Sequence, residues 1–193
     1  TSENFVGITN GVVEFDEGAA AVGSAVAFES AATNQIGSTF DSNSNKVVVL
    51  YRDAGNSNTG TAAIGTVSGT SITFGTPVVF RLPVFGGYGA AYNTAVFDSN
   101  SNKVVIVYGD YGNGGRGAAR VGTVSGTTIS FGTEVIYEAG ASSYNSIAFD
   151  SNSNKVVVAY KDGGDSGKGK AIVGTVSGTD ISFGTAAVYE TGD

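Results

Sequence analysis

The fold is decided by the stretch Phe149-Asp150-Ser151-Asn152-Ser153-Asn154-Lys155 and the apolar run Val156–Tyr160 that follows it. The heptapeptide recurs unchanged at Phe40–Lys46 and Phe97–Lys103, so the copies start 57 and 52 residues apart. A second motif, Gly-Thr-Val-Ser-Gly-Thr, begins 25 residues after each Phe, at Gly65, Gly122 and Gly174. A recurring period of about this length is typical of propellers, solenoids and repeat arrays.

Each copy divides into four short strands. The first ends at the Phe of the heptapeptide, as in Ser146–Phe149, and the second follows its Lys, as in Val156–Tyr160. The third is Ala171–Val176, and the fourth runs from Ile181–Phe183 on through Ala187–Tyr189. These runs are β-branched and aromatic and are bounded by Gly, Asn, Asp and Ser, as strands usually are. Four antiparallel strands in roughly 50 residues match the size of a propeller blade.

The sequence therefore predicts an all-β, β-propeller-like fold of four-stranded antiparallel blades, with about 3.5 units. The second strands, Val47–Tyr51, Val104–Tyr108 and Val156–Tyr160, are expected to be the most buried. Val22–Glu29 resembles the fourth strand Gly184–Glu190. The predicted parts are a leading half unit over 1–35, blade 1 over 36–82, blade 2 over 83–138 with a five-residue insertion before its first strand, and blade 3 over 139–193.

The ends of this array should not remain uncovered, because exposed strand edges and apolar faces favour association. Phe5–Phe15 is expected to form two strands or an outer hairpin before Val22–Glu29. Either Val22–Glu29 covers the last unit of its own chain in a strained ring of about four blades, or it docks on a neighbouring chain. Docking between chains, which we favour, would give a dimer of about seven blades or a filament.

The repeats Phe149–Tyr160 and Ala171–Glu190 resemble the tandem repeats of large phage and bacterial surface proteins from aquatic environments. Such proteins are often labelled tail-fibre or propeller-repeat proteins. The leading segment Glu3–Thr9 is similar to a segment that precedes such repeats. The resemblance implies an extracellular, cell-surface or virion location and a role in adhesion or scaffolding.

Composition excludes much of known enzymology. The 193 residues include no His and no Cys, so catalytic triads with His or Cys and sites with imidazole or thiolate ligands are excluded. None of the 17 carboxylates stands in a distinctive motif that breaks the repeat, so we expect no enzyme and no required cofactor. The net charge is −7 and the ten cations are scattered, which disfavours nucleic acid as a partner. No apolar run is long enough for membrane insertion.

Two kinds of loop could bind calcium through oxygen ligands, and both have a simpler interpretation as turns. Asp41-Ser42-Asn43-Ser44-Asn45 and its copies at Asp98 and Asp150 alternate oxygen ligands, but a Lys follows each, which favours a hairpin turn. The loops between second and third strands each keep the pattern Asp-x-Gly-Asn/Asp. Their candidate calcium ligands are Asp53, Asn56, Asp110, Asn113, Asp162 and Asp165.

A possible binding surface follows from the way the copies differ. The loops after the second and fourth strands vary in charge and aromatic content, and in an up-and-down blade they emerge on the same face. Loops on a rigid scaffold often carry binding residues, although drift in unconstrained loops is the alternative. The candidate ligand-binding residues are Arg52, Phe85, Tyr88, Tyr92, Tyr111, Arg116, Tyr144 and Lys168.

These observations predict a non-enzymatic structural or adhesive repeat protein that self-associates through its end strands. The alternative is a lectin-like propeller that binds surface glycans through the variable loops.

Overall fold

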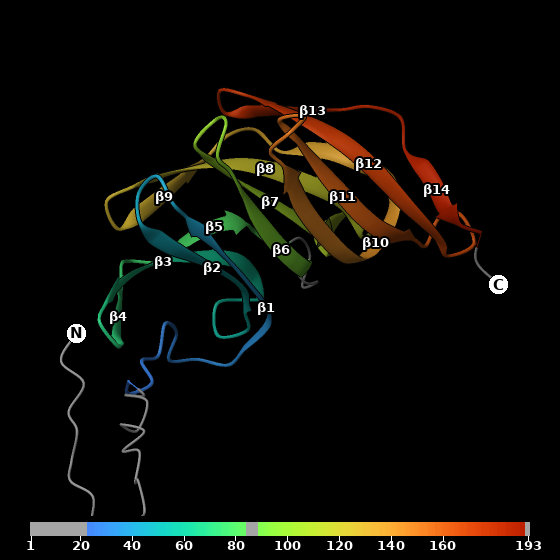
Figure 1. The fold of residues 1–193 in the computed structure, drawn as a ribbon. Helices are drawn as coiled ribbons and strands as arrows, with labels where there is room; N and C mark the ends of the chain where they lie inside the picture. The colour runs from blue at the N-terminus through green and yellow to red at the C-terminus, as the bar shows by residue number, and fades with distance from the viewer. Residues whose placement is uncertain (1–22, 84–88, 192–193) are drawn as a thin grey trace, which may run out of the picture.

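The computed structural model describes residues 23–83 and 89–191 and confirms an all-β fold of antiparallel strands. Within these ranges there is no α-helix, and one short 3-10 turn, η1 (Tyr111–Asn113), is present. The strands form three groups that follow one another along an arc from β1 to β14 (Figure 1). We call these groups units 1, 2 and 3. Phe5–Phe15, most of the predicted insertion and the extreme C-terminus lie outside the described residues.

Unit 1 is a five-stranded sheet in the order β1-β2-β3-β4, with β5 also paired to β3. Its strands are β1 (Thr33–Asp41), β2 (Lys46–Asp53), β3 (Thr59–Ser68), β4 (Ser71–Phe74) and β5 (Val78–Arg81).

Units 2 and 3 repeat this order but share one long strand, β10 (Val135–Asp150). The first half of β10 pairs with β8, and its second half, from Ser142 onward, pairs with β11. The change of partner lies close to the predicted boundary at residue 138. The remaining strands are β6 (Ala91–Asp98), β7 (Lys103–Asp110), β8 (Arg116–Ser125), β9 (Thr128–Phe131), β11 (Lys155–Asp162), β12 (Lys168–Ser177), β13 (Asp180–Phe183) and β14 (Ala187–Glu190).

The recurring heptapeptides form the turns between first and second strands. The carboxylate of Asp41 accepts hydrogen bonds from the backbone N–H groups of Asn43 and Ser44, at 2.9 and 3.1 Å, and from the Ser44 hydroxyl at 2.7 Å. Asn45 has a φ of 53°, in the left-handed region that Asn tolerates in turns. Asp98 and Asp150 make the same three bonds. The Asp and Asn residues of the motif thus serve the turn.

The predicted fourth strand is divided in two, which corrects the sequence-based assignment of one continuous strand. In unit 3, β13 pairs with the end of β12 and β14 pairs with its start. The backbone N–H of Gly184, between them, donates to the carbonyl of Val173 at 3.0 Å. A Gly inside a strand pattern often marks such an irregularity. Val22–Glu29 was predicted to resemble this strand, but its described part, Gly23–Glu29, has no strand assignment.

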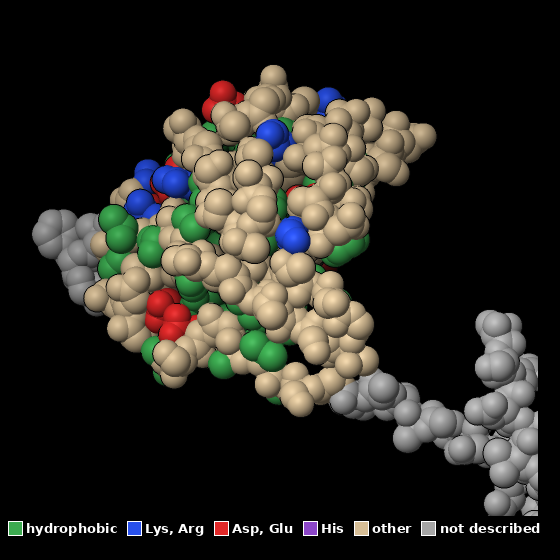
Figure 2. All heavy atoms as spheres, turned by 90° about the vertical axis from the view of Figure 1, so that its left-hand side faces the viewer, with side chains coloured by type: hydrophobic (Ala, Val, Ile, Leu, Met, Phe, Trp, Pro, Cys, Tyr) green, Lys and Arg blue, Asp and Glu red, His purple; other side chains and the backbone are tan. Residues whose placement is uncertain are grey.

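The apolar core lies between the units, because each sheet packs its faces against the next. Val48, Leu50 and Ile64 of unit 1 meet Val104 and Ile106 of unit 2 in one cluster. A second cluster joins the opposite face of unit 2 to unit 3. The second strand β7 is buried from Val104 to Asp110, as predicted, whereas only alternate residues of Val156–Tyr160 in β11 are buried, because no described unit covers the other face of unit 3. Charged side chains are sparse on the side of the molecule shown in Figure 2, where backbone and uncharged polar atoms predominate.

Candidate functional site: a row of tyrosines

Three of the predicted ligand-binding residues form a row of tyrosines across units 2 and 3. The ring centroid of Tyr92 lies 5.1 Å from that of Tyr144 and 6.1 Å from that of Tyr111. Tyr144 is 70% exposed, Tyr111 is also exposed, and Tyr92 is half-buried between them. The first strands β6 and β10 supply Tyr92 and Tyr144, and the loop after β7 supplies Tyr111. The row therefore offers aromatic surface to solvent from three separate segments.

The two strand tyrosines sit at β-bulges with an unusual backbone conformation. Pairing shifts between Ala91 and Thr94 in β6 and between Ser143 and Ser146 in β10. Tyr92 and Tyr144 both have φ = 53°. A bulky residue in the left-handed region is an outlier that costs on the order of 1 kcal/mol or more. Such strain persists only where neighbouring structure imposes it, and it often accompanies a function.

Hydrogen bonds between units hold these bulges in place. The Asn93 side-chain amide donates to the Gln35 carbonyl at 3.3 Å, and the Asn145 amide donates to the Tyr92 carbonyl at 3.4 Å. The Tyr92 backbone N–H also donates to Oε1 of Gln35 at 2.9 Å. Gln35 occupies the same bulge in unit 1, with φ = 56°, so the aromatic row does not continue onto that unit.

The surroundings of Tyr111 keep its hydroxyl group protonated. Burial, and then the neighbouring hydroxyls of Tyr92 and Tyr144, raise the pKa of Tyr111. The Tyr111 phenol can therefore donate a hydrogen bond near neutral pH, and the ring faces of the row suit apolar contact.

The other predicted ligand residues lie apart from the row or serve ion pairs. Lys168 pairs with Asp165 at 2.8 Å in unit 3, and a guanidinium nitrogen of Arg116 lies 3.8 Å from Asp110. Arg52 is half-buried in β2. Phe85 and Tyr88 lie outside the described residues.

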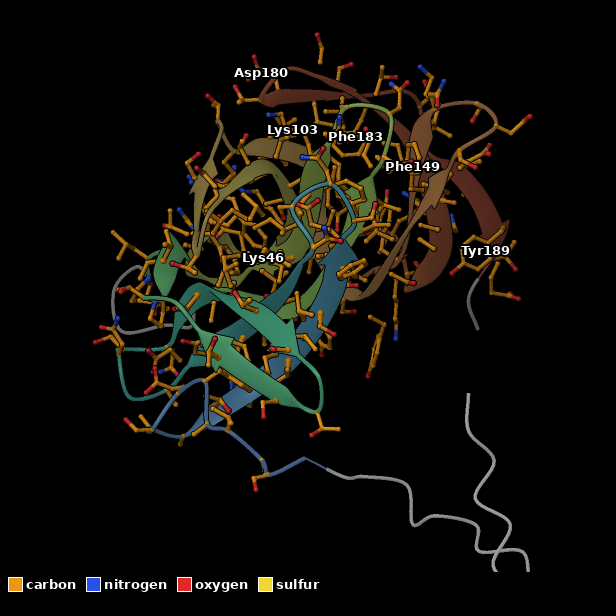
Figure 3. The ribbon with its side chains drawn as sticks, turned by 60° about the vertical axis from the view of Figure 1, so that its left-hand side comes forward. Lys46, Lys103, Phe149, Asp180, Phe183 and Tyr189 are labelled. Carbon is orange, nitrogen blue, oxygen red and sulfur yellow. The ribbon has the colours of Figure 1, made fainter. Side chains whose placement is uncertain are left out.

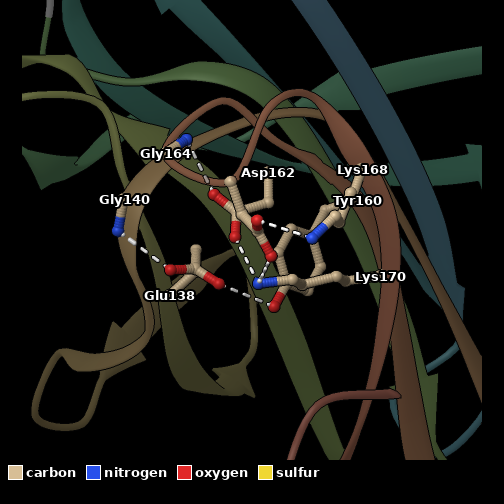
Figure 4. Close-up of polar contacts among 8 residues, drawn as sticks. Glu138, Gly140, Tyr160, Asp162, Gly164, Lys168 and Lys170 are labelled. Atoms are coloured by element: carbon tan, nitrogen blue, oxygen red, sulfur yellow. Dashed lines mark hydrogen bonds and ion pairs between the residues drawn. The ribbon is translucent and has the colours of Figure 1, made fainter. Parts of the chain in front are cut away.

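The predicted calcium ligands are drawn into structural contacts. In unit 3, Lys170 pairs with Asp162 at 2.5 Å and with Asp165 at 3.1 Å, and the backbone N–H of Gly164 donates to Asp162 (Figure 4). These two carboxylates raise the pKa of Lys170, so its positive charge is retained.

The corresponding loops of the other two units differ in their contacts. In unit 2, the Arg81 guanidinium binds both oxygens of Asp110, at 2.8 and 2.9 Å, and Asn113 lies in η1. In unit 1, Asp53 accepts a hydrogen bond from the backbone N–H of Asn56 at 3.0 Å. Within the described parts of the chain, no group of three or more acidic side chains could hold a metal ion.

Calcium is therefore expected to leave the stability unchanged. A ligand present at a hundred times its dissociation constant stabilises a fold by about 2.7 kcal/mol, which a thermal melt detects readily. Since Arg81 and Lys170 already neutralise Asp110 and Asp162, melting temperatures with millimolar calcium and with a chelator should coincide. A rise in melting temperature with calcium would restore the metal-binding hypothesis.

The strain at Tyr144 predicts an unusual order of stabilities. Tyr144→Ala removes the ring but keeps a side chain in the left-handed conformation, whereas Tyr144→Gly relieves the strain. The Gly variant should therefore be more stable than the Ala variant by about 1 kcal/mol in urea unfolding. Ser143 provides the matched control, because its φ is negative or extended and Ser143→Gly should be less stable than Ser143→Ala. If the Gly and Ala variants had the same order of stability at both positions, Tyr144 would not be strained.

The structure brings Tyr92, Tyr111 and Tyr144 together, but it places Tyr92 and Tyr144 in strands, whereas sequence reasoning had put them in connecting loops. Sequence reasoning also missed how the tyrosines are held. The bulges, the inter-unit amide contacts and the pairing of Arg81 with Asp110 were not predicted. A Tyr-Asn pair recurs at the bulges, at Tyr92-Asn93 and Tyr144-Asn145, and this repetition was the available clue.

Comparison with known proteins adds no identity, since no protein-family model and no curated protein matches the chain. Within the described residues, no helix is long and apolar enough to cross a membrane.

Proposed function

We propose that the chain is a non-enzymatic structural or adhesive repeat module of a virion, an extracellular fibre or a cell surface, and that its units are propeller blades that self-associate at their ends. The observation that carries this proposal is the contrast between equivalent valines of units 2 and 3. Val105 and Val121 of unit 2 are fully buried by unit 3. Their equivalents in unit 3 are Val157, which is half-buried, and Val173, which is 48% exposed. The last unit thus presents to solvent the face by which the other units stack.

The chemistry of the carboxylates supports a structural role. Each buried carboxylate among the described residues accepts hydrogen bonds from its own turn or from a neighbouring cation, as described above for Asp41, Asp53, Asp98, Asp110 and Asp162. Carboxylates committed in this way are poor general acids or bases. Nucleic acid and the membrane interior are not partners in this proposal, because the chain is acidic overall and its cations are scattered.

The native mass of the assembly tests this proposal. Light scattering over a wide concentration range should give a mass above the 19.3 kDa of one chain, and electron microscopy should show discrete rings or fibres. A monodisperse monomer at every concentration would refute self-association.

The tyrosine row favours glycan binding as a second candidate function. Aromatic rings that carry hydroxyl groups suit contact with both the apolar faces and the hydroxyls of a sugar. Tyr92 and Tyr144 keep a strained backbone conformation at their bulges, and such strain often accompanies a function. Binding on a glycan array that is lost in Tyr111→Ala and Tyr92→Ala would support this function, and an array without hits would count against it.

A further inference from the structure

Four segments of seven residues share one sequence pattern, and three of them pack against the unit that follows them in the sequence. Each begins with Gly, carries Phe or Tyr at its sixth position and ends with a charged residue. They are Gly23–Glu29, Gly75–Arg81, Gly132–Glu138 and Gly184–Glu190. The first precedes unit 1, and the last is the C-terminal segment of unit 3. The structure thus contains one more segment of this type than it has units to receive them.

The aromatic residue of each of the first three segments contacts the same position of the following unit. Its ring packs at an angle against the tyrosine near the end of the second strand, with centroid distances of 5.0, 5.2 and 5.2 Å for Phe28–Tyr51, Phe80–Tyr108 and Tyr137–Tyr160. Phe80 and Tyr137 are consequently 2% and 8% exposed, whereas Tyr189 is 64% exposed. Tyr189 lies at the far end of the molecule, away from the other labelled side chains (Figure 3).

The glycine that opens each segment gives an independent measure of the same contact. A Cβ placed on Gly23, Gly75 or Gly132 would lie only 1.7, 2.0 or 2.0 Å from a threonine carbonyl oxygen in the next unit. These threonines end the recurring hexapeptides, at Thr70, Thr127 and Thr179. For Gly184, the nearest described atom outside the adjoining residues is the Val173 carbonyl oxygen of its own unit, at 3.8 Å. Gly184 nevertheless makes the same backbone hydrogen bond as Gly75 and Gly132. Among the described residues, Gly184 therefore lacks the close contact with a following unit that Gly75 and Gly132 make.

The geometry points to a second copy of the chain as the partner: Gly184–Glu190 of one copy takes the place of Gly23–Glu29 on unit 1 of the other. This inference rests on the proposed function and names the surfaces that associate. In the exchanged pair, Tyr189 stacks on Tyr51 of the second copy, as Phe28 does within one chain. Glu190 then accepts the hydrogen bond from the Tyr51 hydroxyl that Glu29 now accepts at 3.4 Å.

The stoichiometry of this exchange favours a dimer. Each copy has three units, and reciprocal exchange between two copies gives a ring of six, within the range of about four to eight blades found in closed propellers. A head-to-tail contact that repeats from unit to unit closes into a ring when the rotations that relate each unit to the next sum to a full turn. The contact is the one already repeated between units 1 and 2 and between units 2 and 3, so both surfaces are present in the chain.

Gly184→Val tests the inference, because the open position tolerates a side chain within one chain but not in the exchanged pair. The wild-type chain should have twice the 19.3 kDa mass in light scattering. Gly184→Val should weaken the dimer at least about tenfold, since the added side chain would meet the Thr70 carbonyl of the second copy. Its far-ultraviolet circular dichroism should match that of the wild type. Tyr189→Ala should weaken the dimer without that backbone clash.

Val188→Thr is the matched control in the same segment. Val188 is 49% exposed, and its equivalents Val79 and Ile136 remain 38% and 36% exposed in units that are covered. This variant should therefore dimerise like the wild type. Dimers that resist both Gly184→Val and Tyr189→Ala would overturn the exchange while leaving self-association intact. A wild-type chain that is monomeric throughout would overturn both proposals.

Discussion

Val105→Asp is expected to abolish cooperative folding. Val105 is fully buried at the centre of β7, where it is in register with Val96 of β6 and Val121 of β8. Its side chain belongs to the cluster that joins units 2 and 3. A carboxylate there has no cation to pair with in this cluster, and such burial costs several kcal/mol. Because the total stability of a domain is only about 5–15 kcal/mol, the folded state should be lost.

Urea unfolding followed by circular dichroism measures this effect. Val67→Asp is the control, because Val67 is also a strand valine but is 56% exposed. Val67→Asp should change the free energy of unfolding by no more than about 0.5 kcal/mol, as is usual for surface substitutions. A soluble Val105→Asp variant with a cooperative transition near that of the wild type would show that the two faces of β7 are wrongly assigned.

Arg81→Met should be the next most damaging change, with a loss of about 3 kcal/mol at neutral pH. Arg81 in β5 makes a bidentate pair with Asp110, whose side chain has no exposed surface. Removal of the guanidinium leaves a buried carboxylate without its main partner, since Arg116 lies farther away at 3.8 Å. Lys168→Met is the control, because the exposed pair of Lys168 with Asp165 should contribute at most about 1 kcal/mol.

The loss in Arg81→Met should depend on pH in a defined direction. Burial already raises the pKa of Asp110, and this effect outweighs the lowering by Arg81. Without Arg81 that pKa rises further, so the folded variant keeps a proton that the unfolded chain releases near pH 4. Stability from this proton is present at low pH and is lost as the pH rises through the folded pKa. The difference in the free energy of unfolding between wild type and variant should thus be small near pH 4 and largest at neutral pH. A gap that is constant over this range would contradict the role of Asp110.

Local chemistry explains which parts of the fold were predictable. The turn at Asp41 depends on residues that follow one another directly, and the run Val104–Tyr108 indicates a strand by composition alone. The bulge at Tyr92 could not be predicted in this way, because tyrosine disfavours the left-handed region and only contacts with another unit impose it. The pair of Arg81 and Asp110 spans two units, and no local pattern specifies it.

The candidate site shows the same division. Strand order predicted that Tyr92, Tyr111 and Tyr144 share one face, whereas their ring contacts depend on how the units pack. The break at Gly184 was visible as a glycine inside a strand pattern, but its meaning as a contact point emerged only from the comparison with Gly75 and Gly132.

The strand β10 has a consequence for how the chain opens and closes. The repeat in the sequence suggests three equivalent modules, each with its own beginning and end. Yet β10 continues from one sheet into the next, and a buried network joins Tyr137, Ser142 and Asn145 at the crossing. Local opening of the sheet of unit 2 or unit 3 therefore disturbs the hydrogen bonds that β10 makes in the other sheet. The two sheets should thus exchange their amide protons as one cooperative element. The sequence repeat therefore corresponds to one unit, whereas the cooperatively opening element comprises units 2 and 3.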